Sequence, residues 1–290
     1  MTENILTIKD LHVSISDQFK NNPEILHGVS LSLAKGEIIG VVGESGSGKT
    51  MTMKAIMGLL PSNASASWET YTFDGIARSL NARKIDAAMI FQDSMTALDP
   101  LKTIGYHLME VVKRTKTIEN KAIKSTIISS LEQVGIQDPI AVANKYPHQL
   151  SGGMRQRVLI AMAILTQAKL LIADEPTTAL DVTIQAQILR LIYKLHLEKQ
   201  LSIIFITHDL GIVAQISSRV YVMRDGIVVE EGTTQEIFQD ARHSYTKMLL
   251  NASKMIIENN SKIFSQSLNK NQLPQKMTNI SETHFVREES

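Results

Sequence analysis

The amino-acid sequence predicts an α/β fold with a largely parallel sheet. Three continuous apolar segments, 37–42, 170–173 and 201–207, resemble strands that are buried on both faces of such a sheet. Elsewhere apolar residues recur with helical spacing, notably over 49–59 and 182–198. Strands that alternate with helices along the chain indicate an α/β fold in which most strands run parallel.

The N-terminal part predicts strands of another kind. Apolar and polar residues alternate over 5–15 and again over 26–33, which is typical of half-buried strands. Two short stretches, 70–74 and 87–91, are further strand candidates. The strand predicted at 37–42 runs directly into a glycine-rich loop, and a helix follows that loop.

A mostly helical insertion is predicted from residue 99 to about 157, where helical spacing dominates and strand signals are few. Ser151 is the expected N-cap of a helix that continues to Leu165, because its hydroxyl can accept a backbone N–H of the first turn. Further along, an Asp-Gly pair between apolar runs at 220–224 and 227–230 predicts a β-hairpin.

The composition changes near residue 251. Before it, residues 1–250 are expected to form one domain that contains the helical insertion. After it, Asn, Ser, Lys and Gln dominate, and the apolar residues lack a clear period. The segment 251–290 is therefore predicted to be a polar, poorly ordered C-terminal extension that the domain can lose without harm.

The composition also excludes several kinds of site and partner. The 290 residues include no cysteine, which rules out disulfides, thiolate zinc sites and cysteine-ligated iron–sulfur clusters. A formal net charge of +1 and 5% aromatic residues give no sign of a nucleic-acid partner. No signal peptide is expected, and the longest apolar run, 158–165, is far shorter than the roughly 20 residues that span a bilayer. Any membrane contact is therefore expected to come through a partner.

The glycine-rich loop carries the clearest chemical signal. It matches the phosphate-binding pattern G-x-x-x-x-G-K-[ST] through Gly43, Glu44, Ser45, Gly46, Ser47, Gly48, Lys49 and Thr50. Glycines let backbone N–H groups approach phosphates, the Lys49 ammonium can reach the β- and γ-phosphates, and the Thr50 hydroxyl is a magnesium ligand. A chance glycine turn is the alternative, and the buried strand before the loop argues against it. The expected ligands are ATP and Mg²⁺.

An acidic pair follows the predicted strand 170–173. Ligands of open parallel sheets bind at the carboxyl ends of the strands, and Asp174 and Glu175 lie at such an end. Asp174 is expected to hold Mg²⁺ through water, and Glu175 to act as the general base on the attacking water. A solvated acidic turn is the alternative, which the nearby phosphate-binding pattern disfavours.

The run LSGGMRQR at 150–157 lies between the glycine-rich loop and the acidic pair. These three segments in this order resemble the ATP-binding cassette of ABC transporters over roughly residues 4–250. The resemblance implies a RecA-like P-loop core with a mostly parallel sheet, an N-terminal antiparallel β region and an inserted α-helical subdomain. It also implies a dimer in which the first turn of one subunit's signature helix caps the γ-phosphate held by the other. That turn comprises Ser151, Gly152 and Gly153.

The resemblance implies roles for three further residues. Gln92 matches the Q-loop, which senses Mg²⁺ and the attacking water, and His208 matches the switch histidine, which contacts the γ-phosphate. Asp181 matches the D-loop, which lies along the dimer seam. Apart from the resemblance, Gln92 is a polar strand end and His208 an ordinary loop residue.

One branch of the family fits best. The string QDSMTALDP at 92–100, Met154 and the run 181–189 resemble the D-type ATPase of the oligopeptide, dipeptide and nickel importers. The resemblance implies a heterodimer with an F-type ATPase on two transmembrane permeases at the cytoplasmic face of the cell membrane, served by an external solute-binding protein. Ile15 stands where the family has its adenine-stacking aromatic, so the way adenine is stacked stays open.

Several alternatives stay open. Import of di- or oligopeptides is the first interpretation and import of nickel or a metal chelate the second, because the permeases and the binding protein choose the substrate. A homodimer is the alternative to the heterodimer. A non-transport ABC ATPase of DNA repair or translation would need zinc cysteines, long coiled coils or a second cassette, none of which the sequence contains. A binding module without catalysis is disfavoured, because Glu175, His208 and the glycine-rich loop are intact.

Overall fold

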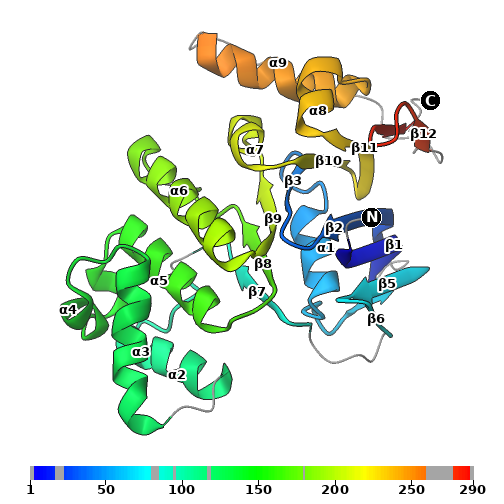
Figure 1. Cartoon of the computed structure of the whole chain (residues 1–290). Helices are drawn as coiled ribbons and strands as arrows, with labels where there is room; N and C mark the ends of the chain where they lie inside the picture. The colour runs from blue at the N-terminus through cyan, green and yellow to red at the C-terminus, as the bar shows by residue number, and fades with distance from the viewer. Residues whose placement is uncertain are drawn as a thin grey trace. The chain divides into compact units, whose positions relative to one another are not determined.

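The computed structural model describes residues 3–16, 23–79, 85–93, 96–115, 119–178, 180–258 and 277–287. The chain divides into two compact units, whose elements are labelled in Figure 1. The first unit comprises residues 1–85 and 204–290, and the second comprises residues 86–203.

An antiparallel sheet forms the N-terminal part of the first unit, in the order β2-β1-β5-β6 with β4 paired to β1. Its strands are β1 (Asn4–Ile15), β2 (Glu24–Ala34), β4 (Ala64–Ser67), β5 (Thr70–Phe73) and β6 (Ile76–Ala77). The alternation of β1 changes phase at Asp10, whose φ of 54° marks an irregularity in the pairing. Ile8 before this point and Leu11 after it are therefore both buried.

The second sheet of the first unit follows the order β12-β13-β11-β10-β3-β9, and β9 runs across the division between the units. Its strands are β3 (Ile38–Val42), β9 (Ser202–Thr207), β10 (Arg219–Arg224), β11 (Ile227–Thr233), β12 (Met277–Asn279) and β13 (Phe285–Arg287). Strand β3 is parallel to β10 and wholly buried, as its apolar run predicts. The predicted hairpin is β10–β11, and its turn residues Asp225 and Gly226 have φ of 47° and 79°, as the tight turn requires.

Four helices complete the described part of the first unit: α1 (Lys49–Ile56), α7 (Leu210–Ile216), α8 (Thr234–Asp240) and α9 (Ser244–Glu258). Helices α7, α8 and α9 lie beside the β10–β11 hairpin (Figure 1). Their apolar side chains share one core with the sheet, made of Val42, Leu210, Val213, Val220, Val222, Ile227, Val229, Ile237, Tyr245 and Leu250. Burial of such side chains is the main contribution to the stability of this unit.

The second unit contains a parallel pair of strands and the predicted helical insertion. The strands are β7 (Ala87–Ile90) and β8 (Leu170–Asp174). The helices are α2 (Ile104–Thr115), α3 (Asn120–Gln133), α4 (Pro139–Ala143), α5 (Gly152–Leu165) and α6 (Val182–Lys199). Helix α2 buries Ile104, Leu108 and Val112, which recur every four residues on one face. The predicted α/β class, with an N-terminal antiparallel region and a helical insertion, is confirmed.

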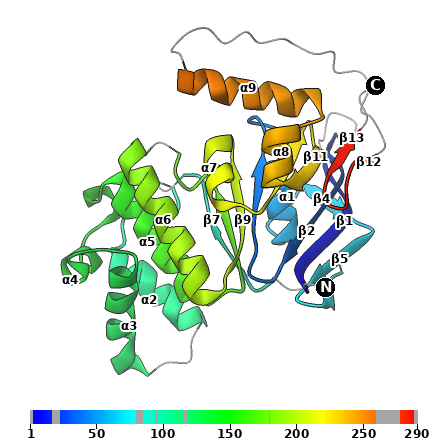
Figure 2. The same ribbon diagram turned by 45° about the horizontal axis from the view of Figure 1, so that its top comes forward.

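The prediction of a poorly ordered polar extension over 251–290 is wrong for the described residues of that segment. Residues 251–258 continue α9, and residues 277–287 form a hairpin whose strand β13 pairs with β11 (Figure 2). The prediction failed because this hairpin is held by polar contacts rather than by an apolar face. Of its side chains only His284 and Val286 are buried, so the sequence shows no core-forming period.

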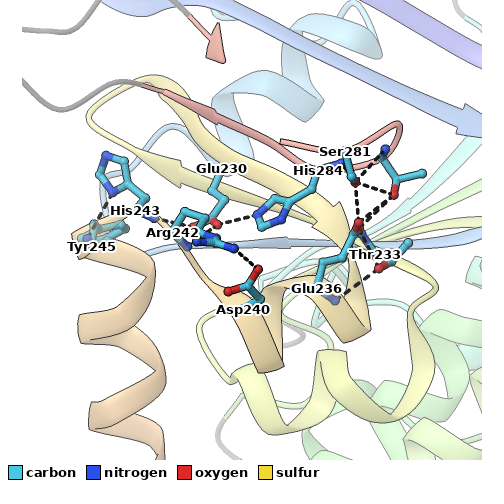
Figure 3. Close-up of polar contacts among 10 residues, drawn as sticks. Glu230, Thr233, Glu236, Asp240, Arg242, His243, Tyr245, Ser281 and His284 are labelled. Atoms are coloured by element: carbon cyan, nitrogen blue, oxygen red, sulfur yellow. Dashed lines mark hydrogen bonds and ion pairs between the residues drawn. The ribbon is translucent and has the colours of Figure 1, made fainter. Parts of the chain in front are cut away.

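Glu236 of α8 holds the turn of this hairpin (Figure 3). Its carboxylate accepts hydrogen bonds from the Ser281 hydroxyl at 2.6 Å and from the Thr283 hydroxyl at 2.9 Å. It also accepts the Thr233 N–H at 2.8 Å, which completes a capping box at the start of α8. Partial burial alone would raise the pKa of Glu236, but these hydrogen bonds outweigh burial and lower the pKa from 4.5 to about 2.

We expect the hairpin to loosen in acid. A carboxylate with a lowered pKa stabilises the folded state above its unfolded pKa, and this contribution is lost as the pH falls from about 4.5 towards 2. Hydrogen exchange at the amides of Ile280 and Ser281, which both donate to the carbonyl of His284, measures this loss. The Glu236→Gln variant should show the fast exchange already at pH 6. Equal protection of the wild-type chain and the Glu236→Gln variant at every pH would contradict the stabilising role of the Glu236 carboxylate.

Candidate active site

The glycine-rich loop connects β3 to α1 in the first unit. Two of its glycines are required by close contacts. A Cβ added to Gly43 would lie 2.1 Å from the carbonyl oxygen of Met223, and one added to Gly48 would lie 2.7 Å from the Leu26 side chain. Gly48 also has a φ of 101°, which L-residues with side chains rarely adopt. The predicted strand, glycine loop and helix are therefore confirmed in this order.

Lys49 lies at the centre of this loop. Its side chain is buried, and its ammonium donates to the carbonyl oxygens of Gly43 and Glu44, each at 2.7 Å, and to the Ser47 hydroxyl at 3.2 Å. The loop thus curls around a positive charge at the N-terminus of α1, where backbone N–H groups and the helix dipole also favour an anion. Thr50 follows in the first turn of the same helix. This arrangement suits phosphate.

The acidic pair and Gln92 meet in the second unit. Strands β7 and β8 are parallel with Ile90 opposite Ala173, so the residues after them emerge at the same edge. Gln92 donates from Nε2 to Glu175 Oε2 at 2.9 Å. Glu175 has a φ of 46°, an uncommon conformation for a residue other than glycine and one that occurs often at functional sites. Asp174, at the end of β8, is buried.

Thr178 is a contact of Glu175 that sequence reasoning missed. Its hydroxyl donates to Glu175 Oε2 at 2.8 Å, so this hydroxyl and the amide of Gln92 both donate to the same carboxylate oxygen. The sequence does place Thr178 three residues after Glu175, but a Glu and a Thr at this spacing are common in turns and do not by themselves indicate a contact. Donors on Oε2 fix the orientation of the carboxylate.

The signature turn and Asp181 also come together in the second unit. Ser151 is the N-cap of α5, as predicted, and its hydroxyl accepts the Met154 N–H at 3.3 Å. Asp181 caps α6 in the same way, by accepting the Ile184 N–H at 2.9 Å. A Cβ on Gly153 would lie 2.6 Å from the Ile184 side chain, so the glycine lets the starts of the two helices approach closely.

The predicted site residues therefore fall into two groups. The first unit carries the glycine-rich loop and His208, which follows β9 directly. The second unit carries Gln92, the acidic pair, the signature turn and Asp181. The expected magnesium ligands offer the hydroxyl of Thr50, the amide of Gln92 and the carboxylate of Asp174, oxygen-bearing groups that suit this hard cation.

A further finding bears on the membrane. Among the helices of the described segments, none combines the length and the apolar character that crossing a bilayer demands.

Comparison with known proteins relates these features to one family. Residues 26–178 match the family model described as ABC transporter. The chain is 45% identical over 268 residues to the dipeptide transport ATP-binding protein DppD of Haemophilus influenzae. This match covers 90% of this chain and 81% of that protein. It is 46% identical over 254 residues to the oligopeptide transport ATP-binding protein OppD of Bacillus subtilis, covering 85% of this chain and 71% of that protein.

Solved structures share the fold. A dimeric ATP-binding cassette in a post-hydrolysis state, bound to ADP and phosphate, superposes with a TM-score of 0.68 at 24% identity. The match covers 79% of this chain and 98% of that one. At this level of identity the likeness shows the fold alone.

Proposed function

The chain belongs to the ABC transporter family, and we propose that it is the D-type, ATP-hydrolysing subunit of an importer of dipeptides or oligopeptides. The observation that carries this proposal is the glycine-rich loop wrapped around the buried ammonium of Lys49. The named relatives are ATP-binding proteins of dipeptide and oligopeptide transport, which favours peptides over the nickel or metal-chelate alternative.

The proposed chemistry is hydrolysis of ATP. The loop and Lys49 hold the β- and γ-phosphates. Thr50, Gln92 and Asp174 would hold Mg²⁺, which would neutralise charge that develops on the phosphate oxygens. Glu175 accepts a proton as water attacks the γ-phosphorus, and the bond from that phosphorus to the leaving oxygen of ADP breaks. Gln92 and Thr178 keep the Glu175 carboxylate in one orientation through Oε2. His208 contacts the γ-phosphate.

The proposal includes a dimer. Ser151, Gly152 and Gly153 form the N-terminal turn of α5, where N–H groups favour an anion, and they cap the γ-phosphate bound to the partner cassette. Asp181, next to this turn, lies along the seam. The partner is a second, F-type ATPase, and the pair works on two permeases at the cytoplasmic face of the membrane, with an external solute-binding protein.

Uptake by cells tests the proposed substrate. The chain is replaced in its own cells by the Glu175→Gln variant, and uptake of a radiolabelled dipeptide and of radiolabelled nickel is measured. Loss of dipeptide uptake with normal nickel uptake is the expected result. The reverse pattern would assign the chain to a metal importer, and normal uptake of both would remove it from import of either.

The Ser151→Arg variant tests the dimer. The bulky side chain should block the γ-phosphate site of the partner and prevent closure, while ATP binding at this chain's own loop stays at the wild-type level. The measurement is a mixed dimer that carries the change only in this chain, scored at each site for binding and hydrolysis. If hydrolysis is lost at this chain's own Lys49 site and the partner's site works normally, the proposal that Ser151 caps the nucleotide of the partner is wrong.

A further inference from the structure

Tyr245, at the start of α9, reaches the glycine-rich loop. Its hydroxyl oxygen accepts the backbone N–H of Glu44 at 3.0 Å. The side chain is buried in the same core as Val42, the residue at the end of β3. The guanidinium of Arg224 lies 5.0 Å from the ring centroid, on its face. Burial raises the pKa of Tyr245 to about 12, so the hydroxyl stays protonated and neutral at physiological pH.

The peptide unit between Gly43 and Glu44 is held from both of its polar groups. Its carbonyl oxygen, on Gly43, accepts the Lys49 ammonium at 2.7 Å, and its N–H, on Glu44, donates to the hydroxyl of Tyr245. A peptide plane with partners on both groups cannot rotate without breaking one of them. Tyr245 therefore fixes the peptide to which the lysine is anchored.

Buried polar contacts hold Tyr245 in turn (Figure 3). Its N–H donates to His243 Nδ1 at 3.1 Å, and the N–H groups of Arg242 and His243 donate to the carboxylate of Glu230 at 2.7 and 3.1 Å. The C-terminal hairpin reaches the same carboxylate, because His284 Nε2 lies 2.7 Å from Glu230 Oε1. Glu230 has no exposed surface, so this support lies inside the first unit.

We propose that Tyr245 is a positioning residue for the phosphates of the nucleotide, acting through the Gly43–Glu44 peptide and Lys49. The inference rests on the proposed function, which places the phosphates at this loop. It gives the start of α9 a role in nucleotide affinity in addition to its role in the core.

The Tyr245→Phe variant tests this role. Phenylalanine keeps the ring and its packing and removes only the hydroxyl that receives the Glu44 N–H. The loss of one hydrogen bond predicts a Kd for ADP about 2- to 10-fold higher than in the wild-type chain. The KM for ATP should rise with it, while kcat at saturating ATP changes little. Fluorescence titration with a labelled ADP and steady-state kinetics provide the two readouts.

Tyr221→Phe is the matched control. Tyr221 is also buried, but its hydroxyl bonds to Ser32 of β2 rather than to the glycine-rich loop: it accepts the Ser32 N–H at 3.1 Å and donates to the Ser32 carbonyl at 3.2 Å. This variant also loses a buried hydroxyl and should melt at a lower temperature, but its Kd for ADP should equal that of the wild-type chain. Equal shifts of Kd in both variants would overturn the proposal, because they would reflect general loosening.

Lys49→Ala separates this inference from the proposed function. If Lys49→Ala weakens ADP binding and Tyr245→Phe binds ADP like the wild-type chain, the positioning role is wrong and the site stands. If Lys49→Ala leaves ADP affinity unchanged, the phosphates do not lie at this loop, and both proposals fail.

Discussion

Replacement of Glu175 by glutamine is expected to lower ATP turnover by about 100- to 10,000-fold, the usual contribution of a general base. An amide of nearly the same shape cannot take a proton from the attacking water. Gln92 and Thr178 donate to one carboxylate oxygen, and the amide oxygen of glutamine can accept both hydrogen bonds. The variant should therefore bind ATP normally and accumulate as an ATP-bound dimer with its partner.

Single-turnover hydrolysis together with ATP titration separates chemistry from binding. Glu198→Gln is a suitable control, because it makes the same chemical change at an exposed position of α6. It should hydrolyse ATP at the wild-type rate. Turnover of Glu175→Gln within a few-fold of the wild type would remove Glu175 from the role of general base.

The parts of the structure that could be predicted from the sequence are those built from neighbours along the chain. The glycine-rich loop, the helix cap at Ser151 and the turn at Asp225 each depend on residues within a few positions of one another. Their geometry follows from local chemistry: glycines for positive φ and close approach, a hydroxyl for a helix N-terminus, and an Asp-Gly pair for a tight turn.

The parts that sequence missed depend on distant residues. Tyr245 lies 201 positions from Glu44, and His284 lies 54 positions from Glu230. Each contact joins elements that only the folded sheet brings together. The prediction of a poorly ordered C-terminal extension failed for the same reason, because the short polar strand β13 gains its stability from partners on β11 and α8. A single sequence shows the composition of such a segment, but it does not show which distant residues the segment contacts in the folded chain.

Replacement of Lys49 by alanine is expected to weaken ATP binding by about 10- to 100-fold, the effect of losing a charge-assisted hydrogen bond to phosphate. The structure adds a second cause. The Lys49 ammonium holds the carbonyl oxygens of Gly43 and Glu44, so its removal also releases the loop that presents N–H groups to the phosphates. Both effects weaken the binding of ATP.

The measurement is titration with a fluorescent ATP analogue, accompanied by a melting curve. Lys35→Ala is the matched control, because Lys35 forms its ion pairs with Glu3 and Asp74 in the N-terminal sheet. It removes one ammonium from the same unit and should leave ATP affinity unchanged. A Lys49→Ala protein that melts normally and binds ATP like the wild type would show that the loop does not hold the phosphates. The proposed hydrolysis would then lack its anchoring cation, and the function assigned to this chain would have to rest on another site.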